Sequence, residues 1–258
     1  FIYISYITLS IFLYLLLKKN KLIQIFKSKF FFILFLITLF ICLLFLYPIA
    51  ENMKINNLGI DQDNCIKEML RNFVNFSYPY QKSYLGNPCS TGPFIALLYI
   101  PYLFIGDYYF VIINIIFIYL FYFLINQNLN LTGNLLFYIT FINLVNLELL
   151  SAGTDFFVIG VLYAVYIYVL SLNQNNKIIQ IIIFLSTILF YGSRIMFLIA
   201  FPIILFITYK KNSYTNNLIH IISYIFVLLI YFILWHYGGE DFHPSHLIFK
   251  TFYFLNNL

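Results

Sequence analysis

Charge is what this sequence has least of. Asp, Glu, Lys and Arg together make up 9% of its 258 residues, whereas a soluble domain has about a quarter. Hydrophobic residues make up 63% of the chain and aromatic residues 22%. This balance excludes a soluble protein, and no polar stretch is long enough for a separate soluble domain. The apolar residues form long runs without the period-two alternation of barrel strands, which predicts an all-α polytopic bundle of transmembrane helices.

Other features are missing as well. No basic stripe or tail is left over for nucleic acid, because the lysines sit in short loops where they orient a membrane protein. Residues 1–17 lack the charged start and the small-residue cleavage site of a signal peptide, so we expect them to form a span. We find no internal repeat. The sequence does not begin with Met, so we interpret residues 1–258 as one transmembrane domain and expect a fragment.

The apolar runs predict eight or nine spans. The lysines between residues 18 and 29 mark a cytoplasmic loop by the positive-inside rule, so the next span leads to the opposite side. Residues 92–125 must then make one net crossing, with one of their two segments re-entrant or tilted along the interface. The candidate segments are 1–17, 30–50, 92–106, 108–125, 135–150, 156–172, 178–192, 195–209 and 218–235.

Residues 51–93 form a polar island between these spans, and we expect a structured outer loop there that carries the active site. The island holds four acids, four bases and two of the three cysteines. Residues 64–76 have the pattern of a short amphipathic helix at the membrane surface. In an oxidising compartment Cys65 and Cys89 could form a disulfide that closes the loop.

Asp61 and Asp63 are the sharpest feature of the island. A carboxylate just past a span suits a general base that removes a proton from an acceptor hydroxyl. Two close carboxylates also suit a divalent cation bound against phosphate, the one cofactor the sequence suggests. The alternative is a solvated loop in which one Asp caps a helix.

Asp155 and Arg194 interrupt apolar sequence further along. Arg194 is the only arginine after residue 71, and a guanidinium at the outer ends of two helices suits a lipid phosphate, which it can bind through two parallel hydrogen bonds. The alternative is an interfacial anchor. Asp155 follows Gly153 and Thr154 at the start of a span, where it is either an N-cap or a functional acid.

His243 and His246 follow Glu240 and Asp241 in the C-terminal tail. Four such groups in seven residues could bind zinc, but Pro244 breaks a regular helix face. The histidines could instead contact a phosphate or the acceptor. Glu148, two residues from a predicted helix end, is either an interfacial anchor or a functional acid.

The order of these motifs resembles the GT-C superfamily of polytopic membrane glycosyltransferases. Members have an acidic motif in the first outer loop, a Pro-containing entry into the next helix, a Thr-Asp helix start and a basic residue between two later spans. The matching stretches are 59–63, the turn Tyr78-Pro79-Tyr80, 92–101, 151–155 and 192–202.

The resemblance implies transfer of a sugar from a polyprenyl-phosphate donor to an acceptor glycan, lipid or protein on the periplasmic, extracellular or lumenal face. Asp61 would be the catalytic base, and Asp63 would support it or bind metal. Arg194 would hold the donor phosphate and Asp155 would orient donor or acceptor. Tyr80, His243 and His246 would contact substrate.

Two other functions fit the sequence. A transporter or flippase of a lipid-linked saccharide would also place acids and an arginine near the membrane, although transporters usually have paired broken helices in two related halves and charges near the midplane. A non-catalytic assembly subunit would tolerate loss of both Asp61 and Asp63.

Overall fold

The computed structural model describes most of the chain after residue 28. The predicted first span, the basic loop after it, Asp61 and the tail with His243 and His246 lie outside the described residues. The described ranges are 29–55, 62–80, 89, 91–128, 137–138, 140–141, 143–171, 177–209 and 214–238.

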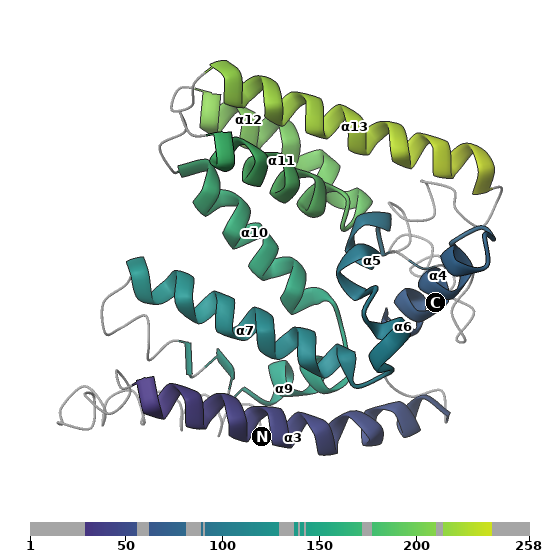
Figure 1. Ribbon diagram of the computed structural model, residues 1–258, viewed down its shortest axis with the longest axis vertical. Coiled ribbons are helices and arrows are strands. Elements are labelled where there is room, and N and C mark those ends of the chain that lie inside the picture. Colours follow the sequence, from purple (N-terminus) through teal and green to yellow (C-terminus); the bar gives the residue numbers. More distant parts are fainter. Residues whose placement is uncertain are drawn as a thin grey trace, which may run out of the picture.

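Three helices form one side of the molecule. The long helix α3 (Lys29–Ile55) contacts α7 (Tyr109–Asn128) and the short α9 (Leu144–Ser151), and all three lie together at the bottom of Figure 1. Aromatic rings fill the contact between α3 and α7, where Phe32 stacks on Tyr122 with ring centroids 3.5 Å apart. Phe and Tyr supply large buried surfaces for such a contact.

A second group lies on the opposite side. It consists of α11 (Lys177–Tyr191), the 3₁₀ helix η1 (Ile195–Ala200), α12 (Phe201–Tyr209) and α13 (Tyr214–Gly238). Helix α10 (Phe156–Ser171) contacts both α7 and α11, and therefore joins the two groups (Figure 1).

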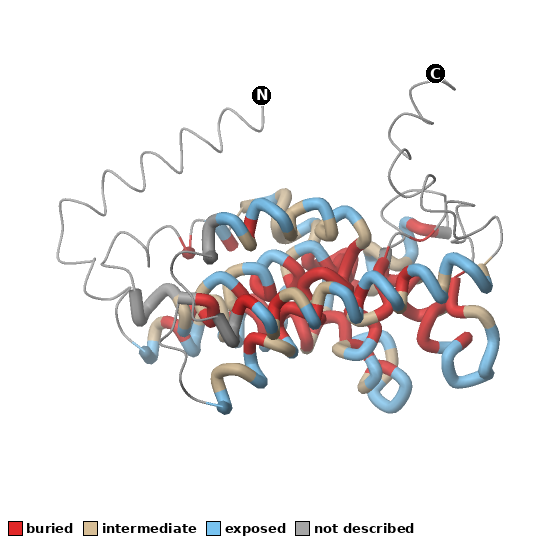
Figure 2. The backbone as a smooth tube through the Cα atoms, turned by 90° about the horizontal axis from the view of Figure 1, so that it is seen from above, coloured by how far each residue is buried: buried red, intermediate tan, exposed pale blue. Residues whose placement is uncertain are grey.

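Three shorter helices gather near one end of the molecule. Helix α4 (Gln62–Val74) contacts α5 (Pro93–Tyr99) and α6 (Tyr102–Ile105), and α5 reaches both α7 and α11. Buried residues follow the inner faces of the helices and exposed residues their outer faces (Figure 2). All secondary structure in the described ranges is helical.

Within the described ranges, two helices are long and apolar enough to cross a membrane: Lys29–Lys54 in α3 and Asn217–Gly238 in α13. Helices α9 and α10 count as a third span if the 103° bend between them is a break within one span. Their outward side chains are large and apolar, as a lipid environment requires. The chain is thus a helical membrane protein.

The helical prediction is confirmed, and the span count of eight or nine stays a prediction. Helices α5 and α6 have 7 and 4 residues, so neither can cross a bilayer, and α7 is the long segment of residues 92–125. The predicted segment 135–150 does not run as one helix, because Asn143 adopts an extended conformation and its side chain caps α9 by accepting from the backbone N–H of Val145. The helix predicted over residues 64–76 is present as α4, and its position at the membrane surface stays a prediction.

Candidate functional site

The site begins where α3 ends. Tyr47, Glu51 and Lys54 follow each other at intervals of four and three residues, so they lie on one face of the helix. Asp63 and Lys67 are four residues apart and share a face of α4 in the same way. The two faces meet, because each carries an acidic and a basic side chain that can pair with those of the other helix.

These residues and Asp107 form what we call the lysine cluster. Lys54 bonds to Glu51 and lies 2.5 Å from Asp63 Oδ1. The Lys67 ammonium lies 3.1 Å from Asp63 Oδ2, 3.3 Å from Glu51 and 3.2 Å from Asp107. Asp63 and the two lysines are buried, whereas the Asp107 side chain is 55% exposed, so the cluster opens to solvent there.

Two aromatic side chains cover the lysine cluster. The Tyr47 hydroxyl donates to Asp63 Oδ2 at 3.4 Å. The Lys67 ammonium lies 5.6 Å from the centre of the Tyr47 ring and 5.4 Å from that of Phe110, close enough for a cation–π attraction. The cluster is thus held from α3, α4 and α7 together.

Burial determines the titration of Asp63. Loss of solvation, together with the neighbouring Glu51 carboxylate, raises the pKa of this carboxyl to about 6, although Lys54 and Lys67 oppose the rise. Lys67, which faces three acids, has its pKa raised. Asp63 therefore takes up a proton at a mildly acidic pH, where an exposed Asp would still be ionised.

A second group of site residues lies at the break between α9 and α10. Gly153 has a φ of +67°, which favours glycine, and a Cβ there would lie 3.0 Å from the Tyr47 ring and 3.3 Å from Asp63 Cβ. The break therefore packs directly on the lysine cluster. Two residues later, the Asp155 carbonyl accepts from the N–H of Ile159 and opens α10.

Asp155 binds Arg194 across 39 residues of sequence. The guanidinium donates to Asp155 Oδ1 at 2.6 Å, and its Cζ lies 4.8 Å from the centre of the Phe156 ring. Asp155 is fully buried and Arg194 is 7% exposed. Asp155 Oδ2 has no hydrogen-bond partner among the described residues. We call this the Asp155–Arg194 pair.

Two glycines place Arg194. Between α11 and η1, Gly192 crosses the start of α5, where the Gly92 N–H donates to the Ser193 carbonyl at 2.7 Å and the Phe94 N–H to the Gly192 carbonyl at 3.2 Å. A Cβ on Gly92 would lie 2.1 Å from the Gly192 carbonyl oxygen. The crossing satisfies N–H groups at the helix start that have no partner within their own helix.

Tyr99 lies between the two ionic groups. It is the last residue of α5 and fully buried, with its ring 5.0 Å from that of Phe110, and it interacts electrostatically with Asp155, Asp63 and Arg194. Its hydroxyl has no partner among the described residues. Burial raises the pKa of Tyr99, so the hydroxyl stays protonated and can donate.

Three of the residues singled out in the sequence therefore come together: Asp63, Asp155 and Arg194. Tyr80 is buried next to Tyr78 and close to Tyr231 of α13, whose hydroxyl donates to the Gly192 carbonyl. No group of three or more His, Cys, Asp or Glu side chains that could hold a metal occurs among the described residues. Asp61, His243 and His246 lie outside them.

Sequence reasoning missed Tyr99, Lys54 and Lys67. The lysines had a readable signal, since Lys67 follows Asp63 by four residues and Lys54 follows Glu51 by three. Tyr99 had none, as one of 24 tyrosines. Cys65 and Cys89, whose pairing the sequence left open, form a disulfide that ties α4 to the chain ahead of α5.

These observations define a class: a helical membrane protein with a buried ionic site where α3, α4, α5, α7 and two chain breaks meet. Comparison of the chain with protein-family models, with curated proteins and with solved structures finds no match in any of the three.

Proposed function

We propose that this protein is a membrane glycosyltransferase that moves a sugar from a polyprenyl-phosphate donor to an acceptor on the non-cytoplasmic face. The observation that carries the proposal is the meeting of Asp63, Asp155 and Arg194 around Tyr99, from three segments far apart in the chain. Charges are costly in a membrane protein and mark function by default.

Arg194 supplies the positive charge at the break between α11 and η1. A guanidinium has five N–H donors in a fixed fork, so it suits a carboxylate and a phosphate oxygen at the same time. In the proposed reaction it stabilises the negative charge that develops on the lipid phosphate as the bond from the phosphate oxygen to the sugar C1 breaks. Asp155 orients the guanidinium.

The base is assigned to Asp61. Asp63 is held between Lys54 and Lys67 and covered by Tyr47, so it suits ordering the start of α4 better than reaching a substrate. Asp61, two residues earlier, would take the proton of the acceptor hydroxyl while the hydroxyl oxygen forms its bond to C1 and inverts it. A divalent cation at this loop would serve by neutralising phosphate charge.

The proposed topology is multi-pass, with eight or nine spans and the site on the outer side. The Cys65–Cys89 disulfide supports this side, because disulfides persist in oxidising compartments. The site lies at the end of α3, which is a candidate span. This position fits a reaction at the membrane surface.

The test is transfer from a polyprenyl-phosphate sugar in membranes that contain the wild type, Asp61→Asn, Arg194→Lys or Arg71→Ala. We expect a loss of at least 100-fold for the first two variants. Arg71 is a matched control, since its side chain is 56% exposed and bonds to Glu68 and the Tyr102 hydroxyl, neither of which belongs to the proposed site. Unchanged transfer in both Asp61→Asn and Arg194→Lys would overturn the proposal.

A flippase of lipid-linked saccharide is the second candidate. The observation that favours it is the 103° bend between α9 and α10, because transporters bind substrates at broken helices. Proteoliposomes loaded with a fluorescent lipid-linked saccharide, assayed first without and then with acceptor, separate the two functions. Movement between leaflets that depends on Arg194 indicates a flippase, and product formation without such movement indicates a transferase.

A further inference from the structure

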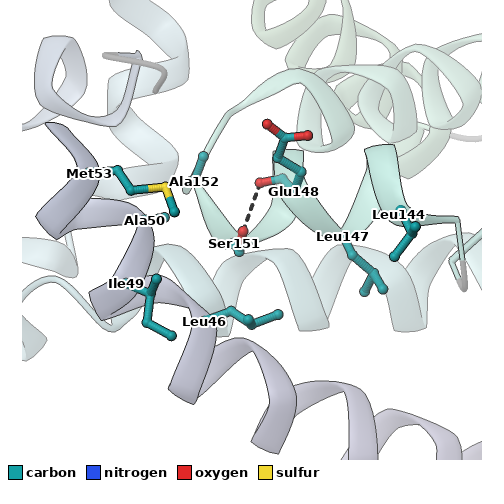
Figure 3. A pocket seen from close by; sticks show the side chains of 9 residues that line it. All are labelled: Leu46, Ile49, Ala50, Met53, Leu144, Leu147, Glu148, Ser151 and Ala152. Atoms are coloured by element: carbon teal, nitrogen blue, oxygen red, sulfur yellow. Dashed lines mark hydrogen bonds between the residues drawn. The ribbon is translucent and has the colours of Figure 1, made fainter. Parts of the chain in front are cut away.

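A second site lies beside the lysine cluster, on a neighbouring face of α3. A pocket of about 350 Å³ separates α3 from α9 (Figure 3). On α3 its wall is a stripe with helical spacing, formed by Leu46, Ile49, Ala50 and Met53. Ligand pockets typically start at about 300 Å³, so the volume suits one segment of a hydrocarbon chain.

The facing wall has the same spacing. Helix α9 contributes Leu144, Leu147, Glu148 and Ser151, and Ala152 follows at the break. The pocket stays open because small side chains, Ala50, Ser151 and Ala152, occupy the part of the seam where larger ones would meet. The contact between α3 and α9 therefore leaves a cavity.

Exposure indicates that the occupant comes from the membrane. Three lining side chains of α3 are large, apolar and exposed: Leu46 at 38%, Ile49 at 52% and Met53 at 51%. They belong to a candidate span, where the surrounding medium is hydrocarbon. A lipid chain can therefore enter the pocket directly from the bilayer.

Glu148 gives the site its selectivity. It is the only charged residue that lines the pocket, and its carboxylate lies at one edge, apart from Leu46, Ile49 and Leu147 in Figure 3. It makes no ion pair with a described residue. A carboxylate beside hydrocarbon attracts a cationic hydrogen-bond donor and repels a phosphate that carries no compensating charge.

We infer that this pocket binds a glycerophospholipid whose headgroup ends in a primary ammonium. One acyl chain lies between α3 and α9, and the ammonium donates to Glu148. An anionic lipid-phosphate donor is disfavoured here by charge, so the site is separate from the Asp155–Arg194 pair. The inference does not rest on the proposed glycosyl transfer.

Three lipids with identical chains test the inference: phosphatidylethanolamine, phosphatidylcholine and phosphatidylglycerol. Native mass spectrometry of the purified, delipidated full chain measures how much of each stays bound. We expect ethanolamine to exceed choline about tenfold, because only the primary ammonium donates a charge-assisted hydrogen bond. Phosphatidylglycerol, which carries a net negative charge, should bind most weakly.

Two variants separate headgroup from chain. Glu148→Gln should remove the preference among the three lipids, and its control Glu68→Gln, a partly exposed carboxylate of α4, should keep it. Ala50→Phe fills the pocket and should weaken all three about tenfold, whereas Ile41→Phe, on an exposed part of α3, should not.

Leu46→Trp is a second filling variant, one helical turn before Ala50 in α3, for use if Ala50→Phe does not fold. Equal binding of phosphatidylglycerol and phosphatidylethanolamine to the wild type would overturn the headgroup assignment. Unaltered binding to a folded filling variant would overturn the pocket as the site.

Discussion

The lysine cluster and the Asp155–Arg194 pair differ in how many partners each charge has. In the lysine cluster, Asp63 contacts two ammonium groups and Lys67 contacts three carboxylates. In the pair, the single ionic contact found for Asp155 within the described residues is the one to Arg194. Shared contacts make the cluster tolerant of losing one member, whereas Asp155 has no second ionic partner within the described residues.

Solvent access differs in the same direction. The lysine cluster reaches solvent through Asp107, whereas Asp155 is sealed and Arg194 nearly so. A buried ion pair is weak evidence for stability, since apolar residues of the same size often do as well. A sealed pair at two backbone breaks, with one carboxylate oxygen left over, is therefore better explained by function than by architecture.

The largest effect is expected from Asp155→Ala. This change leaves the Arg194 guanidinium buried without its carboxylate, which should lower the free energy of unfolding by about 3–5 kcal/mol. Lys54→Met should cost less, about 1–2 kcal/mol, because Asp63 keeps Lys67 as a partner. Thermal unfolding in detergent measures both, and equal losses would remove the distinction between cluster and pair.

A double replacement sharpens the same comparison. Asp155→Leu with Arg194→Met removes both charges and keeps the volume, so stability should return to within about 1 kcal/mol of the wild type. Activity should not return. A double variant that restores both would mean that the pair is only structural.

The glycine crossing that places Arg194 is expected to be the next most sensitive point. Gly92→Ala would push a Cβ to 2.1 Å from the Gly192 carbonyl oxygen and 2.4 Å from the Tyr231 hydroxyl. Overpacking of this kind should cost about 3 kcal/mol. Gly160→Ala is the matched control, because nothing lies within 4 Å of its Cβ position, and it should be neutral or slightly stabilising in α10. Thermal unfolding of the two variants measures the difference. Equal unfolding temperatures would contradict the close approach of Gly92 to Gly192.

The sequence predicted the helices from its long apolar runs. It predicted several residues of the site because a charge in apolar sequence is conspicuous. Asp155 and Arg194 stand out in this way, and so does the acidic start of α4. The i, i+4 spacing of Asp63 and Lys67 is typical of an ion pair, but we interpreted Asp63 as an active carboxylate and did not predict the pair.

The rest depends on contacts between distant segments. Gly92 and Gly192 meet across about 100 residues, and nothing in either local sequence indicates it. Tyr99 becomes part of the site only because α5 is held between Phe110 and the crossing. The break at Asn143 within the predicted span 135–150 was missed because hydropathy averages over a polar residue that prefers to cap a helix.

The disulfide bears on the lysine cluster through α4. Cys65 lies between Asp63 and Lys67 in α4, and its bond to Cys89 closes a loop with a sequence separation of 24 residues. Replacing both by Ser should cost about 3 kcal/mol through the larger freedom of the unfolded chain. Cys42→Ser, at an exposed position of α3, should change the unfolding temperature little. A reducing agent should reproduce the effect in the wild type and leave the double variant unaffected.

The smallest effect is a dependence on pH that belongs to the lysine cluster. Asp63 has its pKa raised to about 6 in the folded chain, above the ordinary value of about 3.9, so the folded state holds the proton more tightly than the unfolded state. The resulting stability is present below pH 4 and is lost as the pH rises to about 6, by at most about 3 kcal/mol. Asp63→Asn should flatten the dependence of the unfolding free energy on pH between pH 4 and 6, because an amide does not titrate. The charged groups that face this position, Glu51, Lys54 and Lys67, remain in the variant. A slope of the opposite sign in the wild type would mean that the two lysines outweigh burial and keep Asp63 ionised.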